Sequence, residues 1–204
     1  MRVISGRFRG RRLEAPPGTN TRPITDRVKE TLFNMLGVRL DTPGAIPAIA
    51  VLDLFAGTGG LGIEALSRGA QSCLFVERDR RSLRVLRRNL DLIGLESTGC
   101  VAVGNAWTMR IPPADDPGYG LIFLDPPYRD ARDGLRVIDL LVRLAPLLSP
   151  TGLTVFRHEH KTQLPTSALR SLECVDERQL GTMRIWLFAP VAPDGSTGNH
   201  PTEG

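Results

Sequence analysis

Ala50-Val51-Leu52-Asp53-Leu54-Phe55-Ala56-Gly57-Thr58-Gly59-Gly60-Leu61-Gly62 is the stretch of sequence that decides the fold. Residues 50–55 form an apolar run that only Asp53 interrupts, which predicts a strand covered on both faces. The glycines that follow allow a tight turn, and a short helix over 61–68 comes next, closed by Gly69. A buried strand that passes through such a turn into a helix is typical of an α/β domain that binds its ligand at the strand's carboxyl end.

From this stretch onward, segments with strand and helix patterns alternate along the chain. Strands are predicted over 72–77, 100–103, 119–124 and 153–159, and helices over 79–93 and 133–148. The last two β-like runs, 172–178 and 183–189, predict a closing antiparallel hairpin. We therefore expect an α/β fold with a doubly wound, seven-stranded and mostly parallel sheet and right-handed crossovers.

The residues before this sheet predict a small N-terminal extension. Short β-type segments over 2–6 and 11–15 flank a Gly/Arg turn and predict a hairpin. Thr25 is the expected N-cap of a helix over 26–38, and a linker over 41–48 follows. We divide the chain into a basic arm and helix (1–45), a ligand-binding domain (46–189) and a tail expected to be disordered (190–204).

The composition is that of an ordinary globular protein, with 204 residues, 41% hydrophobic content, a net charge of +4 and a pI of about 9.4. No apolar run approaches the roughly 18 residues of a membrane span, and no apolar segment follows the basic start at Arg2. Cys73 and Cys100 lie in predicted strands and are expected to be reduced core residues, which favours a cytoplasmic location. Because no heptad or exposed apolar stripe is present, we expect a monomer.

The glycine-rich turn leaves two classes of ligand open. Gly57, Gly59 and Gly62 satisfy the G-x-G-x-x-G pattern of dinucleotide-binding turns. Glu77 ends the next predicted strand, where a carboxylate can accept hydrogen bonds from ribose hydroxyls. From these residues alone, a nicotinamide dinucleotide and S-adenosylmethionine fit about equally well.

Asp125-Pro126-Pro127-Tyr128 directly follows an apolar run and predicts a rigid polar lip at the end of a buried strand. Proline has a fixed φ and no N–H, so the carbonyls of the lip stay free to accept hydrogen bonds. The Asp125 carboxylate is a second acceptor, and the Tyr128 ring offers a face for a planar base. Two acceptors beside a stacking surface suit the exocyclic amino group of a nucleobase.

Three features favour S-adenosylmethionine over the dinucleotide. The carboxylate of Asp53 suits a ligand with a cationic amino acid end and would repel a pyrophosphate. Asn105 follows the third predicted strand and could hydrogen-bond an adenine ring, and a nicotinamide enzyme has no evident use for the lip. The expected cofactor-binding residues are Asp53, Phe55, Ala56, Gly57, Thr58, Gly59, Gly62, Glu77, Arg78, Asn105 and Ala106.

Arginines dominate the N-terminal arm, where a single acid, Glu14, stands against them. A solvated basic tail and a phosphate-contacting arm both fit this pattern, and the base-binding lip favours the second. Arg22, Arg27 and Lys29 are expected to stay available for solvent or ligand. The expected RNA-binding residues are Arg7, Arg9, Arg11, Arg12, Arg22, Thr25 and Arg27.

The run from Asp53 to Ala70, together with the segment from Arg22 to Asn34 and the Asp125–Tyr128 lip, resembles the RsmD family. The resemblance covers about residues 2–189, although Ile24 and Gly60 stand where the family more often has Thr and Ala. It implies a Rossmann-like class I methyltransferase fold and transfer of a methyl group from S-adenosylmethionine to the N2 amino group of a guanine in bacterial 16S ribosomal RNA. The implied partner is 16S rRNA or the assembled small ribosomal subunit.

In that reaction Asp125 and the Pro126 carbonyl would accept the two N–H bonds of the target amino group, while Tyr128 would stack on the base. These three are the expected catalytic residues. Neither a metal nor a covalent intermediate is required. His158 and His160 flank an acid and are expected to line a surface or cleft rather than hold a metal.

Three alternatives stay open. An adenine-N6 methyltransferase acting on DNA or RNA would use the same lip chemistry. A non-catalytic RNA-binding assembly factor could keep the fold, although it would not need Asp53, Gly57, Gly59, Glu77 and Asp125 together. A nicotinamide oxidoreductase comes last.

Overall fold

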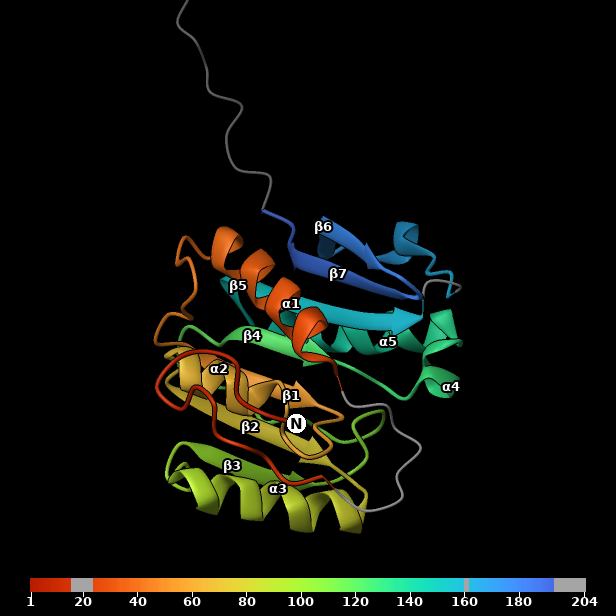
Figure 1. Cartoon of the computed structure of the whole chain (residues 1–204). Helices are drawn as coiled ribbons and strands as arrows, with labels where there is room; N and C mark the ends of the chain where they lie inside the picture. The colour runs from red at the N-terminus through yellow and green to blue at the C-terminus, as the bar shows by residue number, and fades with distance from the viewer. Residues whose placement is uncertain (16–23, 160–161, 193–204) are drawn as a thin grey trace, which may run out of the picture.

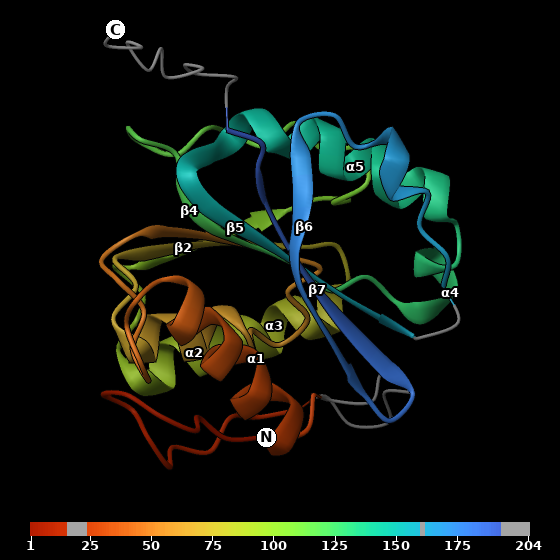
Figure 2. The ribbon, with the colours of Figure 1, turned by 90° about the horizontal axis from the view of Figure 1, so that it is seen from above.

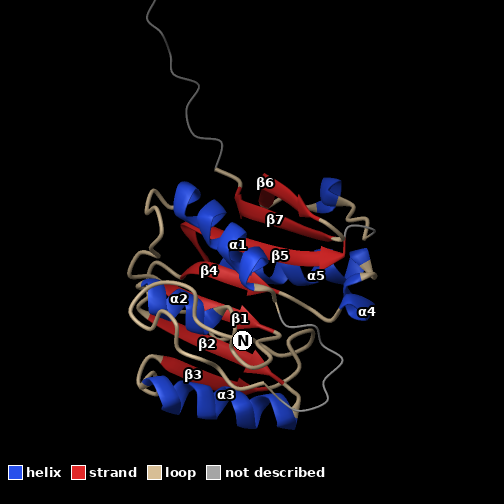
Figure 3. Ribbon diagram, in the orientation of Figure 1, coloured by secondary structure: helices blue, strands red, loops and turns tan. Residues whose placement is uncertain are grey.

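The protein was analysed as a computed structural model, in which residues 1–15, 24–159 and 162–192 are described. Its centre is a seven-stranded sheet in the order β3-β2-β1-β4-β5-β7-β6 (Figure 1, Figure 3). The first five strands of this order are parallel, and β7 runs antiparallel between β5 and β6, as predicted. The strands are β1 (Ala50–Leu54), β2 (Ser72–Glu77), β3 (Gly99–Val103), β4 (Tyr119–Leu124), β5 (Leu148–Glu159), β6 (Leu172–Leu180) and β7 (Met183–Pro190).

Helices cover both faces of the sheet (Figure 2). One face carries α1 (Asp26–Arg39), α2 (Gly62–Arg68) and α3 (Arg80–Ile93), and the other carries α4 (Tyr128–Ala131) and α5 (Gly134–Leu144). Short 3-10 turns span Ala145–Leu147 and Thr166–Ala168. Phe123 packs into the core on the first face and Ile122 into the core on the second, so every residue of β4 is buried. The predicted doubly wound, Rossmann-like architecture is confirmed.

The helices begin and end where their capping residues predict. The Thr25 hydroxyl accepts a hydrogen bond from the Val28 N–H at 3.3 Å, which confirms Thr25 as the N-cap of α1. Asp79 caps α3 in the same way by accepting from the Ser82 N–H at 2.7 Å. Gly94 ends α3 in the left-handed region, at φ 68°, which an L side chain rarely adopts. Two residues, Arg78 and Asp79, separate the end of β2 from the start of α3.

The N-terminal arm is attached to α2. Its two segments pair antiparallel, as predicted, with Arg2 opposite Arg12. The Val3 N–H donates to the Arg11 carbonyl at 3.0 Å, and the Leu13 N–H donates to the Met1 carbonyl at 2.9 Å. The N–H groups of Arg7 and Phe8 donate to the carbonyl and hydroxyl of Ser67, at 2.7 Å and 3.0 Å. Val3 and Leu13 of the arm are buried in the same core as the sheet. The division of the chain at residue 45 therefore stays an interpretation of the sequence, because this core continues across it.

Lys29 is the clearest error of the sequence analysis. It was expected to be available for solvent or ligand, and it is fully buried. Its ammonium donates to the Arg2 carbonyl at 2.8 Å and pairs with Glu64 at 3.3 Å, while Arg68 pairs with the other Glu64 oxygen at 2.9 Å. The Glu64 carboxylate also accepts from two arm N–H groups, those of Ile4 and Ser5. Burial is tolerated because the charges meet opposite charges and hydrogen-bond partners.

Three other expectations need correction, and three lie outside the described residues. Cys73 is buried as expected, but Cys100 is exposed, because β3 lies at the edge of the sheet. The predicted helix over 133–148 ends at Leu144, and β5 begins at Leu148 rather than at 153. Arg22, His160 and residues 193–204 of the predicted tail lie outside the described residues. In the described part of the chain, the helices are too short or too polar to cross a bilayer.

Candidate active site

The glycine turn after β1 is held from below by two carboxylates. Asp53 accepts a hydrogen bond from the Gly62 N–H at 2.9 Å, and Glu77 accepts one from the Gly57 N–H at 2.8 Å. Gly57 and Gly59 have φ values of 56° and 87°, in the region that favours glycine. Phe55, just before them, has a φ of 61°, a strained conformation for an aromatic residue and one that concentrates at functional sites.

Asp53 lies beneath the turn, not in an open cavity. Its side chain is buried, and burial raises its pKa to about 8, against a lowering by the Gly62 N–H and with further raising by the charges of Asp125 and Glu77. Asp125 and Glu77 therefore lie close enough to Asp53 for their charges to act on it. Direct contact between Asp53 and a cationic ligand stays a prediction, and the contact seen here is with the turn itself.

Glu77 joins the glycine turn to the start of α3. Besides the Gly57 N–H, its carboxylate accepts from the N–H groups of Arg78 and Asp79, at 2.7 Å and 2.8 Å. The side chain is half-buried at the carboxyl end of β2, where ribose contact was predicted. A ribose hydroxyl would have to share or displace one of these backbone bonds.

Two aromatic rings, those of Trp107 and Phe55, pack together beside the turn that follows β3 and contains Asn105 and Ala106. The Asn105 side-chain oxygen accepts from the Trp107 N–H at 3.2 Å, and the Trp107 ring packs 5.0 Å from Phe55. The Arg136 guanidinium lies over the Trp107 ring, 4.3 Å from the ring centre. Trp107 and Arg136 were not predicted. The available signal was a tryptophan directly after the Gly104-Asn105-Ala106 turn in a chain with few aromatic residues.

At the predicted lip, Asp125 is bound by Arg157. The Arg157 Nε and Nη2 donate to the two Asp125 oxygens at 2.9 Å and 2.6 Å. In the pairing of β4 with β5, Leu124 lies opposite Phe156. Asp125 and Arg157 are the next residues along the two strands, and the parallel register therefore brings them together. Burial acts to lower the pKa of Arg157. The charge and hydrogen bonds of Asp125, together with those of Tyr128, outweigh burial, and the pKa of Arg157 is therefore raised. Arg157 was missed by the sequence analysis.

Tyr128 continues the lip and begins α4, a helix that the sequence did not predict. Its ring is half-buried, and its hydroxyl donates to the Met183 sulfur at 2.7 Å. Pro126 is buried and Pro127 is exposed. The lip therefore presents a fixed carboxylate and an anchored tyrosine at the same edge as the glycine turn, because β1 and β4 are neighbouring parallel strands.

The predicted RNA-binding residues are exposed, except for Arg22, which lies outside the described residues. Arg7, Arg9, Arg11, Arg12, Thr25 and Arg27 all lie at the surface. Arg2 of the same arm pairs with Asp26 of α1 at 2.7 Å. Their contact with RNA stays a prediction.

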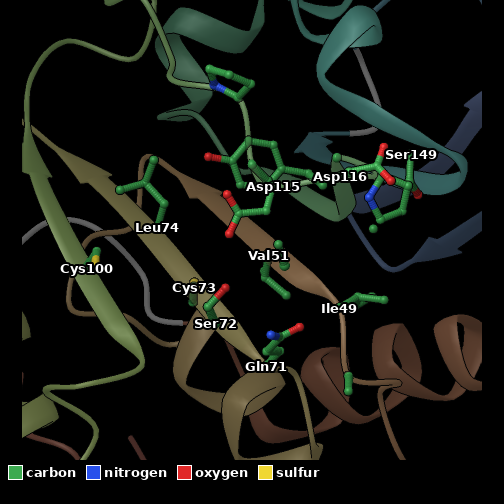
Figure 4. A pocket seen from close by; sticks show the side chains of 18 residues that line it. Ile49, Val51, Gln71, Ser72, Cys73, Leu74, Cys100, Asp115, Asp116 and Ser149 are labelled. Atoms are coloured by element: carbon green, nitrogen blue, oxygen red, sulfur yellow. The ribbon is translucent and has the colours of Figure 1, made fainter.

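Figure 4 shows a pocket of about 380 Å³ at the other edge of the sheet. It is lined by residues at the amino ends of β1, β2 and β4, among them Ile49, Ser72 and Asp115. Ligands of open parallel sheets bind at the carboxyl ends of the strands, so the size of this pocket does not make it the candidate site.

His158 does not line a surface or cleft. It is buried, with its ring stacked on Phe156 at 4.6 Å and edge-on to Trp186 at 5.4 Å. Burial lowers its pKa, against a hydrogen bond with the Glu159 carbonyl that raises it. Within residues 1–15, 24–159 and 162–192, no three His, Cys, Asp or Glu side chains gather in a group that could hold a metal.

Comparison with known proteins places this arrangement among methyltransferases. Residues 1–189 match the family described as conserved hypothetical protein 95. The chain is 41% identical over 166 residues to YlbH of Bacillus subtilis, named for an inferred rRNA methyltransferase activity, which covers 81% of this chain and 86% of that protein. It is 40% identical over 129 residues to the ribosomal RNA small subunit methyltransferase D of Escherichia coli, which covers 63% of this chain and 61% of that enzyme, less than two thirds of its length.

A solved structure from Escherichia coli, that of YhhF, described as an inferred methyltransferase, has the same fold. It superposes with a TM-score of 0.76 at 31% identity, and covers 95% of this chain and 99% of that one. The similarity therefore includes the sheet, the N-terminal extension and the closing hairpin.

Proposed function

Because the chain belongs to the RsmD family, we propose that it transfers a methyl group from S-adenosylmethionine to the exocyclic N2 amino group of a guanine in 16S ribosomal RNA. The observation that carries the proposal is the meeting of two features at one sheet edge. One is the glycine turn braced by Asp53 and Glu77, and the other is the lip of Asp125 and Tyr128.

The residues around the turn fit the cofactor. A side chain built on Gly57 would meet no atom within 4 Å, so there is open space at this position of the turn. Glu77 would hold the ribose, Asn105 and Ala106 the adenine, and the turn with Asp53 beneath it the amino acid end. When bound, S-adenosylmethionine supplies an activated methyl group on a sulfonium, which is why no metal need be invoked.

The lip fits an amino group that is a weak nucleophile. The guanine N2 lone pair is delocalised into the ring, so the protein must orient the nitrogen and stabilise the positive charge that develops on it. Asp125 and the Pro126 carbonyl would accept the two N–H bonds, and Tyr128 would stack on the base, contributing about 1–3 kcal/mol. As the new N–C bond forms, the bond between the methyl group and the sulfur would break, and its electron pair would stay on the sulfur, which leaves as a neutral thioether. One N–H proton would pass from the nitrogen to the Asp125 carboxylate or to water.

The basic arm fits an RNA substrate held by its backbone. A base within structured RNA must be unstacked to reach the lip, at a cost of a few kcal/mol. Exposed Arg7, Arg9, Arg11 and Arg12 would contact flanking phosphates of 16S rRNA or of the assembled small subunit. We further propose that the protein acts in the cytoplasm as a monomer, without metal.

The proposal is tested by incubating the protein with isotope-labelled S-adenosylmethionine and small ribosomal subunits that lack the modification. The RNA is digested to nucleosides and analysed by mass spectrometry. Labelled N2-methylguanosine that disappears with Asp125→Ala supports the proposal. Labelled N6-methyladenosine would show that the target base is adenine rather than guanine. Absence of label despite measured cofactor binding would favour the non-catalytic alternative.

A further inference from the structure

The outer face of α3 carries five arginines that the site described above does not use. Arg80, Arg81, Arg84, Arg87 and Arg88 are all exposed. Their spacing of three and four residues places them on one side of the helix, while Leu83, Leu86 and Leu90 face the core on the opposite side. We call these five residues the α3 arginine face.

Stability of the isolated protein does not account for this arrangement. Arg80 and Arg81 occupy the first turn, which contains no acidic residue beyond the N-cap Asp79 that precedes it, although the amino end of a helix favours negative charge. Arg80 with Arg84 and Arg84 with Arg88 are like-charge neighbours four residues apart, which destabilises a helix. Among the described residues, only Arg88 of the five forms a salt bridge, 3.7 Å from Glu14, and both side chains are largely exposed. An external polyanion would relieve this repulsion.

The α3 arginine face is joined to the N-terminal arm. Asn89 of α3 is buried and binds the Glu14 backbone twice, accepting from its N–H at 2.8 Å and donating to its carbonyl at 3.2 Å. The same amide donates to the Thr58 carbonyl in the glycine turn at 3.0 Å. In Figure 1 the arm passes α2 and reaches α3, so the arginines of both segments lie on the same side of the sheet.

We propose that the α3 arginine face is a second RNA-contacting surface, which binds the phosphate backbone of the substrate beyond the reach of the arm. This inference rests on the proposed function, because it takes the substrate to be RNA. From Arg80 to Arg88 the helix rises about 12 Å, enough for two or three successive phosphates along a strand. Arginine suits this partner because its guanidinium forms paired hydrogen bonds with phosphate oxygens.

The test compares two triple variants that each remove three positive charges. One is Arg80→Gln, Arg84→Gln and Arg87→Gln in the α3 arginine face. The matched control is Arg110→Gln, Arg170→Gln and Arg178→Gln, which are exposed arginines outside α3, the arm and the lip. Binding to small ribosomal subunits lacking the modification is measured against salt concentration, together with the KM for these subunits.

We expect the α3 variant to lose roughly 2 from the slope of log affinity against log salt, since each phosphate contact contributes about 0.7–0.9. Its KM for the subunits should rise at least tenfold, and its melting temperature should stay level or increase as repulsion is removed. An α3 variant indistinguishable from the control would overturn the inference while wild-type methylation leaves the proposed function standing. If the wild-type protein neither binds nor methylates the subunits, the proposed function fails, and this inference fails with it.

Discussion

The guanidinium of Arg157 holds the carboxylate of Asp125 by two hydrogen bonds, at 2.9 Å and 2.6 Å, across the junction of β4 and β5. The side chains retain only 10% and 18% of their exposure, so solvent screens the pair weakly. A two-point contact fixes both the position and the plane of the carboxylate. Arg157 is therefore a positioning residue for the group that is proposed to accept the target N–H bonds.

Arg157→Ala should lower kcat for RNA methylation by about 10- to 100-fold, because small misplacements of a reacting group have effects of this size. It should also lower the free energy of unfolding by about 1–3 kcal/mol, because a partly buried carboxylate loses its partner. Arg157→Lys keeps the charge without the two-point contact, so it should recover stability more fully than kcat. Equal recovery of both by lysine would show that the role is structural only.

Asp125→Ala should reduce turnover by about 10²- to 10³-fold, the effect of removing one group that stabilises transition-state charge. Cofactor affinity, measured by titration calorimetry, should stay near that of the wild-type protein, because the glycine turn is bonded to Asp53 and Glu77 rather than to Asp125. Asp125→Asn retains one acceptor and should lose less activity. Turnover by Asp125→Ala at the wild-type rate would remove Asp125 from the chemistry.

The sequence predicted features that depend on near neighbours and missed side-chain contacts between residues far apart in the sequence. The pattern over 119–124 predicted both ends of β4 correctly, and the glycine turn was predicted to follow the carboxyl end of a buried strand, where it lies. Arg157 could not be assigned, because its partner lies 32 residues away and meets it only through the pairing of β4 with β5. Lys29 was misassigned for the same reason, since Glu64, the acid that permits its burial, lies 35 residues further along the chain.

Asp53→Asn should change the pH dependence of stability. The pKa of Asp53 is raised to about 8, from an ordinary value of 3.8, mainly by burial, so the folded protein keeps a proton that the unfolded chain releases. Its contribution to stability is present below about pH 4 and is lost as the pH rises towards 8. Asparagine has no such titration and can still accept from the Gly62 N–H.

The free energy of unfolding of the variant, taken relative to that of the wild-type protein, should therefore be higher at pH 9 than at pH 5. Urea unfolding at the two pH values measures this difference directly. If the free energies of unfolding of variant and wild type differed by the same amount at both pH values, Asp53 would not be protonated in the folded state at pH 5.

Replacing Arg9, Arg11 and Arg12 by Ala should weaken RNA binding and flatten its salt dependence, because phosphate contacts release counterions. The three side chains are exposed, so the melting temperature should change little. Cofactor binding should be intact, since the Glu14 backbone still binds Asn89 next to the glycine turn. An unchanged salt slope would remove the arm from the RNA interface.

Gly6→Ala should weaken RNA binding without removing any charge, by displacing the arm from α2. A methyl group on Gly6 would lie 1.9 Å from the Ser67 carbonyl oxygen, and φ at Gly6 is +80°. Gly10→Ala is the matched control, because its φ is +84° but a methyl group there meets no atom within 4 Å. Gly10→Ala should lower the free energy of unfolding by about 1–2 kcal/mol, the cost of left-handed backbone strain alone. Gly6→Ala should lower it by more, because the clash with Ser67 adds to the strain.

Hydrogen exchange separates the two glycine variants, because the N–H groups of Arg7 and Phe8 bond Ser67 only while the arm is docked. Gly6→Ala should abolish their protection and raise the Kd for RNA, whereas Gly10→Ala should preserve both. If the two variants lowered RNA affinity equally while only Gly6→Ala released the arm, docking on α2 would not be what positions the arginines. RNA would then be bound by the arm's charge alone, whatever its conformation.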